Sequence, residues 1–130
     1  TTKTVWPFAV PADRQGPYFA AETLDSPDYV EWIRALIEEG FEIASHNASM
    51  GSCTREETVR GLDILSQKLG VQPRLHCNHG QNRENLYWGR ERFRSLPMRF
   101  LATMAKTALE DAPYEGHREG SPYFWGDIAK

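Results

Sequence analysis

The fold of this chain is decided by the stretch Glu39-Gly40-Phe41-Glu42-Ile43-Ala44-Ser45-His46-Asn47. Gly40 suits the left-handed conformation that closes a helix, and residues 41–45 read as a strand that follows at once. His46 comes directly after this strand and before a loop that contains glycine. Because ligands bind at the carboxyl ends of parallel strands, we expect the active edge of the sheet at this position.

Helices are predicted on both sides of this strand. Ser26 is a suitable N-cap for a first helix that ends at Gly40. After the strand, Thr54 and Glu57 have the spacing of a capping box, which begins a second helix. Gly61 lies in the middle of that second helix, where it costs about 1 kcal/mol relative to Ala, so we expect another segment to approach closely there.

Two further strands are predicted, at residues 5–10 and 74–77. The order strand–helix–strand, with short joints that end in glycine, predicts that these two segments and residues 41–45 are adjacent and parallel. The fold class is therefore α/β, with parallel strands and connecting helices. The 130 residues form a single domain.

The last third of the chain is predicted to hold more helix and a short strand. A charged helix is expected over residues 83–93, followed by another helix that starts near residue 95. Residues 123–125 read as a short strand, and the four tryptophans are expected mostly in the core. The apolar side of the later helix consists of Phe100, Leu101, Met104 and Ala108.

Composition limits the classes of function. The chain is 40% hydrophobic and 25% charged, and its net charge of −3 with a pI near 5.8 argues against nucleic-acid binding. No apolar stretch approaches the roughly 20 residues that span a bilayer, so we expect no membrane partner. Cys53 and Cys77 are too few for a disulfide scaffold, and a buried thiol is the simplest interpretation of each.

Candidate site residues gather at the ends of two predicted strands. His46 could bind a metal or transfer a proton, or it could hydrogen-bond the loop backbone instead. His76 and His79 follow the third strand, with Asn78 between them. Their odd spacing places them on opposite faces of a continuing strand, so joint metal binding needs a turn, which Gly80 allows.

The stretch quoted first resembles the polysaccharide deacetylase family, which carries the NodB homology domain. In that family a strand reads roughly G-[HF]-E-I-[GA]-[SN]-H-[ST] and follows a helix that ends in E-x-G. A helix that opens with T-x-E-E comes next, matched by residues 54–70, and then a strand with P-x-x-F-R-x-P-Y-G, matched by residues 73–80. Residues 5–12 resemble the strand A-T-F-F-V-x-P, so the resemblance covers roughly residues 4–82.

The resemblance implies a distorted (β/α) barrel that hydrolyses an acetyl group from a sugar amide or ester. In the family, one Asp and two His hold a divalent metal of the zinc type, which polarises the acetyl carbonyl and activates water. A second Asp acts as base and a late His as acid. His46 matches the first histidine ligand, whereas Met50 stands in the place of the second. A thioether is a poor zinc ligand at such a site.

The acidic motif of the family precedes the first strand predicted here. We therefore expect this chain to be a fragment or a reduced form of a longer barrel. An open sheet edge would then be covered by the tail or by a second copy, which makes a homo-oligomer one expected assembly.

Two functions follow from these observations. The first is a deacetylase-like domain that acts on an acylated sugar, in which His76 or His79 replaces the missing ligand. The alternative is a catalytically inactive relative that binds carbohydrate or a protein partner. In the first, the residues at the strand ends form the site, with His46 as the metal ligand and a substrate-binding set of His76, Asn78, His79 and Trp88.

Overall fold

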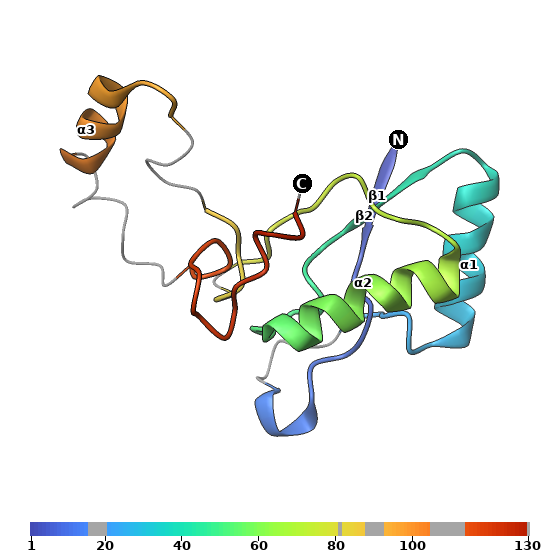
Figure 1. Cartoon of the computed structure of the whole chain (residues 1–130). Helices are drawn as coiled ribbons and strands as arrows, with labels where there is room; N and C mark the ends of the chain where they lie inside the picture. Colours follow the sequence, from blue (N-terminus) through green and yellow to red (C-terminus); the bar gives the residue numbers. More distant parts are fainter. Residues whose placement is uncertain (16–20, 81, 88–92, 105–113, 130) are drawn as a thin grey trace.

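The computed structural model describes residues 1–15, 21–80, 82–87, 93–104 and 114–129. Their elements, in chain order, are β1 (Thr2–Val5), the 3-10 helix η1 (Ala12–Arg14), α1 (Pro27–Glu38), β2 (Glu42–Ser45), α2 (Arg55–Leu69) and α3 (Leu96–Met104). Figure 1 shows α1 and α2 near the two strands and α3 at the opposite end of the molecule.

The sheet is parallel, as predicted. β1 pairs with β2 in a register that runs from Thr2 opposite Glu42 to Val5 opposite Ser45. On its other edge, Ser45 forms a parallel bridge with His76. The Ser45 N–H donates to the Leu75 carbonyl at 3.1 Å, and the Ser45 carbonyl accepts from the Cys77 N–H at 2.8 Å. The α/β class is therefore confirmed, with β2 between the two other segments.

The boundaries of two strands differ from the prediction. β1 covers Thr2–Val5 instead of residues 5–10, because Pro7 and Pro11 have no N–H to donate to a ladder. Past the strand, the Phe8 N–H donates to the Ala48 carbonyl at 3.3 Å, which guides the chain over the loop that follows β2. The predicted strand 74–77 is reduced to the single bridge at His76.

Both predicted helix starts are confirmed. The Ser26 hydroxyl accepts from the Tyr29 N–H at 3.4 Å, and Pro27 occupies the first helical position of α1. At α2, Thr54 and Glu57 form both halves of the capping box. Gly40, with φ of +89°, ends α1 in the conformation that its sequence position requires.

The core lies between the sheet and these two helices. Val5 and Ile43 from the strands pack with Ile33 of α1 and Leu65 of α2, and all four are buried. Gly61 gives α2 the predicted close approach, because a Cβ atom there would lie only 2.7 Å from the Cβ of Ala48. This contact brings α2 against the loop after β2.

The last third of the chain departs most from the prediction. Arg83 and Glu84 lie in a turn, so the helix expected over residues 83–93 is wrong at its start, while residues 88–92 lie outside the described residues. Residues 123–125 form no strand; Trp125 is buried, as expected of a core tryptophan, but Trp32 is 47% exposed. The Ala108 and Trp88 predictions lie outside the described residues.

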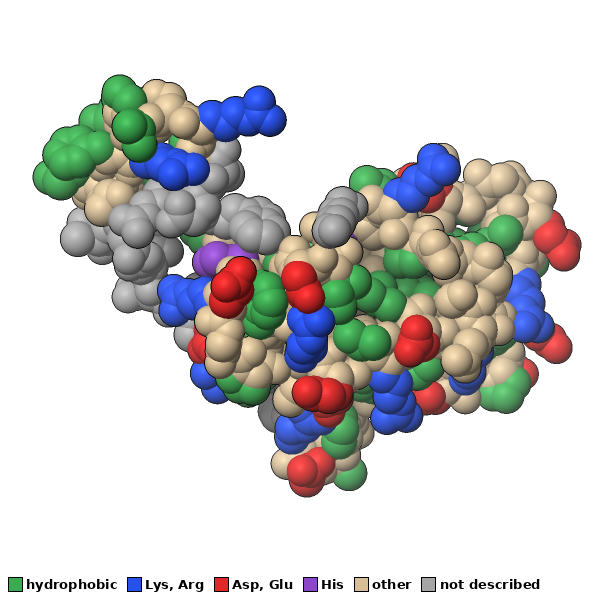
Figure 2. All heavy atoms as spheres, in the orientation of Figure 1, with side chains coloured by type: hydrophobic (Ala, Val, Ile, Leu, Met, Phe, Trp, Pro, Cys, Tyr) green, Lys and Arg blue, Asp and Glu red, His purple; other side chains and the backbone are tan. Residues whose placement is uncertain are grey.

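α3 carries the predicted apolar side chains but buries none of them among the described residues. Figure 2 shows hydrophobic and basic side chains gathered over α3, whereas acidic and basic side chains alternate over the face of the body. No helix among the described residues is both long enough and apolar enough to cross a membrane.

Candidate functional site

Three aromatic rings meet at the carboxyl end of the sheet: Trp6, His46 and His79. Trp6 and His46 follow the register pair Val5–Ser45 and stack with ring centroids 4.6 Å apart. His79 contacts both rings edge-on, at 5.2 Å from His46 and 5.5 Å from Trp6. The expectation that His46 lies within reach of His76 or His79 is therefore confirmed for His79. We call this set the rim cluster.

The electrostatics around His46 favour its neutral imidazole. Burial lowers the pKa of His46, and the neighbouring His79 and Lys3 lower it further. The ring nitrogens Trp6 Nε1 and His79 Nδ1 are buried and have no hydrogen-bond partner among the described residues. A buried polar group without a partner costs free energy, so a partner for either nitrogen would stabilise the rim cluster.

His76 is separated from the rim cluster. Its ring packs edge-on against Trp125, with centroids 4.7 Å apart, and burial lowers its pKa to about 4. Together with Ser45, Asn47 and Thr58, these two residues line a cavity of about 10 Å³, which is room for about one water molecule. The predicted pair of His76 and His79 thus faces two different surroundings, as the odd spacing implied.

The other predicted site residues have structural contacts or are not described. Asn78 is exposed, and its amide both donates to the Leu86 carbonyl and accepts from the Leu86 N–H, at 2.9 and 3.2 Å. Trp88 lies outside the described residues. His117 is half-buried and accepts from the Tyr87 N–H at 3.4 Å.

Asn47 links the two histidines of the rim cluster. It follows His46 directly, adopts a left-handed conformation with φ of +53°, and is almost fully buried. Its side-chain oxygen accepts from the backbone N–H of His79 at 2.6 Å. Its Nδ2 donates to Glu84 Oε1 at 2.8 Å and to Asn85 Oδ1 at 3.0 Å.

Glu84 is a fully buried carboxylate at the centre of this region. Besides Asn47, it accepts from Asn82 Nδ2 at 2.9 Å and from the Cys53 N–H at 2.9 Å. Burial raises its pKa, against the opposite effect of these hydrogen bonds. A Cβ atom at Gly116 would lie 2.0 Å from its carbonyl oxygen, so the tail passes directly over the Glu84 backbone.

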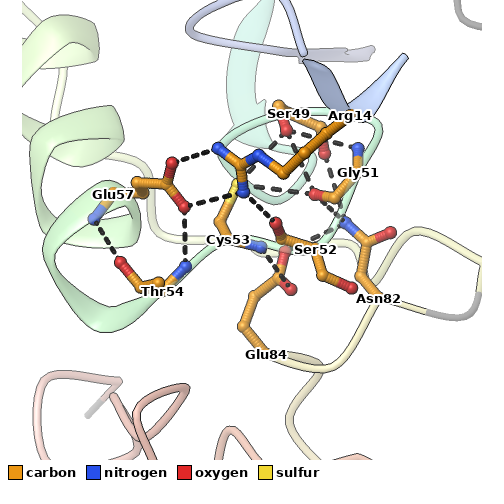
Figure 3. A network of polar contacts seen from close by, with 9 residues as sticks. All are labelled: Arg14, Ser49, Gly51, Ser52, Cys53, Thr54, Glu57, Asn82 and Glu84. Atoms are coloured by element: carbon orange, nitrogen blue, oxygen red, sulfur yellow. Dashed lines mark hydrogen bonds and ion pairs between the residues drawn. The ribbon is translucent and has the colours of Figure 1, made fainter. Parts of the chain in front are cut away.

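A second set of contacts, centred on Arg14, lies beside this carboxylate (Figure 3). Arg14 lies between Glu57 and the Ser52 carbonyl and bonds both, while Glu57 also caps α2. Burial raises the pKa of the Cys53 thiol to about 12, which confirms an inert buried thiol at that position. The same interpretation is wrong for Cys77, which is exposed.

Sequence reasoning found the histidines but missed Asn47, Asn82, Glu84 and Asn85. A usable signal was present, because three of these four residues lie within the stretch of residues 82–85. Asn favours turns over helix interiors, since its amide competes for backbone hydrogen bonds. The charged helix predicted there should have been replaced by a turn.

The described residues do not complete the metal site that the family resemblance implies. They contain no group of three His, Cys, Asp or Glu side chains that could hold a metal ion. Met50 is half-buried at the position of the second histidine ligand. The nearby Glu84 carboxylate already accepts three N–H groups, so it does not take the place of the aspartate ligand.

The chain was compared with known proteins in three ways. It matches no family model, no curated protein and no solved structure. The residues of the rim cluster and the motifs of the sequence are therefore the basis for inferring the function.

Proposed function

We propose that this chain is a polysaccharide-deacetylase-like domain that recognises an acylated sugar at the rim cluster. The observation that carries the proposal is the meeting of His46 and His79 beside Trp6 at the carboxyl end of a parallel sheet. This is the edge at which α/β proteins bind ligands. The motif that ends in His46 supplies the resemblance to the family.

The proposal also includes the barrel fold of the family. β1, β2 and the segment bridged at His76 would be three consecutive strands of the distorted (β/α) barrel. Their order, and the helices between them, agree with the order of the family's motifs.

The chemistry of the rim cluster suits a sugar that carries an amide or ester. Trp6 offers an apolar ring beside a polar N–H, which matches a sugar with apolar and hydroxyl-bearing sides. An imidazole ring carries two nitrogens that can hydrogen-bond, so His46 and His79 can bond hydroxyl groups or an acyl oxygen. All three residues are half-buried and therefore partly accessible.

A catalytically inactive domain that binds carbohydrate or a protein partner is the second candidate, and Met50 favours it. In the family, hydrolysis of the acetyl group depends on a divalent metal, for which the described residues supply the two imidazoles of His46 and His79. These two imidazoles alone do not supply a hydrolytic step. Recognition of the acylated sugar is common to both candidates.

Titration with an N-acetylated glucosamine oligomer tests the proposal. We expect saturable binding to the wild-type chain that weakens about tenfold in His79→Ala, whereas Asp63→Ala, on the exposed surface of α2, serves as the matched control. Binding that His79→Ala leaves unchanged, or no binding at all, would contradict the proposal.

Two further measurements separate the candidates. Zinc calorimetry on wild type and His46→Ala, and an assay for released acetate, are run on the same preparations. Submicromolar zinc binding lost in His46→Ala, together with acetate release, would favour the deacetylase. Sugar binding without either would favour the inactive relative.

A further inference from the structure

We infer that Asn47 and Glu84 are positioning residues of the rim cluster: the buried carboxylate orients the Asn47 amide, and that amide holds the His79 backbone beside His46. The inference deepens the proposed function and rests on it for the role of the two histidines. Its geometry stands on the hydrogen bonds of the described residues alone.

The orientation of the Asn47 amide follows from what lies at its two ends. A carboxylate only accepts hydrogen bonds, and a backbone N–H only donates. Glu84 Oε1 therefore selects the NH2 end of Asn47, at 2.8 Å, which leaves the oxygen to face the His79 N–H at 2.6 Å. In the opposite orientation both contacts would pair like with like.

The His79 peptide is held from its other side as well. Asn85 accepts from the Asn47 NH2 group and donates to the carbonyls of His79 and Gly80, at 3.3 and 3.2 Å. The turn that follows His79 is thus bonded to the same network. Both polar groups of the His79 backbone have partners in the network, which limits where its ring can lie relative to His46.

A buried carboxylate is a poor choice for stability alone. Glu84 has no exposed surface, and its partners among the described residues are uncharged N–H donors. Burying a charge is unfavourable, and apolar side chains of similar volume often fill such sites with equal or better stability. A role in orienting Asn47 accounts for an acceptor at this position.

Two variants and a matched control test the inference. Asn47→Gly removes the amide but tolerates the positive φ. Glu84→Gln keeps the size of the side chain, but its NH2 group must then face one of the N–H donors that the carboxylate accepts. Glu57→Gln is the control, because Glu57 has comparable hydrogen bonds around Arg14 and Thr54 but no contact with the rim cluster (Figure 3). Each protein is examined by NMR at one pH.

We expect hydrogen exchange of the His79 amide to accelerate by about tenfold or more in Asn47→Gly and Glu84→Gln. The ring 15N signals of His46 and His79 should shift in both variants and stay in place in Glu57→Gln. Affinity for the acetylated oligomer should fall about tenfold in the same two variants.

The outcomes are distinguishable. Unchanged His79 exchange and ring signals in folded Asn47→Gly and Glu84→Gln would overturn the inference. Shifted signals in a chain that binds no acetylated sugar would support the positioning network and contradict the proposed function. If neither variant folds, wild-type exchange of the His79 amide as fast as that of exposed Glu119 would overturn the inference by itself.

Discussion

α1 and α2 pack their apolar side chains onto the sheet, whereas α3 leaves its apolar side chains exposed. Ile33 of α1 and Leu65 of α2 have no exposed surface, but Phe100 and Leu101 of α3 are 66% and 58% exposed. Figure 1 shows the reason, since α1 and α2 lie near β1 and β2 while α3 lies apart from both strands.

An apolar stripe therefore predicts a buried face only where a second surface is available to cover it. The free energy comes from the apolar area that both partners remove from water. Val5 and Ile43 provide that area for α1 and α2. Among the described residues, no side chain is buried on α3, so equal helical spacing has different energetic consequences in the two regions.

The largest expected effect comes from truncating one leucine in each region. Leu65→Ala should lower the free energy of unfolding by about 2–5 kcal/mol, because it leaves a cavity in the core. Leu101→Ala should change it by no more than about 0.5 kcal/mol, because Leu101 is already 58% exposed. Urea denaturation checks both, and equal losses in the two variants would end the comparison.

Protonation of His76 should change the free energy of unfolding by up to about 3 kcal/mol. His76 belongs to the packed region, by which we mean the part of the chain packed around the sheet, because Trp125 covers its ring. Its pKa is about 4 when folded, against an ordinary value of 6.5, so the unfolded chain binds more protons between these values. Stability should therefore fall as the pH drops from about 6.5 to 4.

The variant His76→Asn isolates this contribution. It keeps His46 and Glu84, whose pKa values are also shifted, so the difference in unfolding free energy between the two proteins reports His76. That difference should depend on pH only between about pH 4 and 6.5. Parallel stability curves across this range would show that His76 is more accessible than its packing implies.

Gly61→Ala should destabilise the packed region by about 1–3 kcal/mol, although Ala is the better helix former. The new Cβ would lie 2.7 Å from the Ala48 Cβ, and both residues are buried. The double variant with Ala48→Gly removes that clash and should recover part of the loss. Thermal unfolding is the measurement, and a higher Tm for Gly61→Ala alone would refute the close contact.

The smallest expected effect is the loss of a helix cap. Thr54→Ala removes the side-chain oxygen that accepts from the Glu57 N–H, at 3.4 Å, and should cost about 1 kcal/mol. Ser66→Ala, at an exposed position late in α2, serves as the control and should leave stability nearly unchanged. Because Ala is the better helix former, a loss of the same size in both variants would mean that capping is not the cause.

Local chemistry made much of the packed region predictable. Ser26 and Thr54 cap the starts of helices, and Gly40 follows the end of one, each through backbone groups a few residues away. Short sequence patterns were therefore sufficient to predict these helix boundaries. The meeting of His46 with His79 also followed, because the ends of adjacent parallel segments share an edge. Pro7 should have shortened the first strand in the prediction.

The partners of Glu84 were not predictable in the same way. Its contacts with Asn47 and Cys53 join residues 37 and 31 positions apart, and no local periodicity reports such pairs. A carboxylate in a charged stretch is ordinarily solvated, so its burial became visible only in three dimensions. Likewise, helical spacing in α3 correctly indicated a helix but could not indicate that, among the described residues, its apolar side chains stay exposed.

The contact of the tail with the Glu84 carbonyl imposes an order in time. Gly116 passes over this carbonyl, and Trp125 Nε1 donates to it at 2.6 Å from 41 residues later in the chain. At a synthesis rate of about 5–20 residues per second, Trp125 is added on the order of seconds after Glu84. On the ribosome, β1, β2, α1 and α2 can therefore assemble while the Glu84 carbonyl still bonds to water, and the tail covers that carbonyl last.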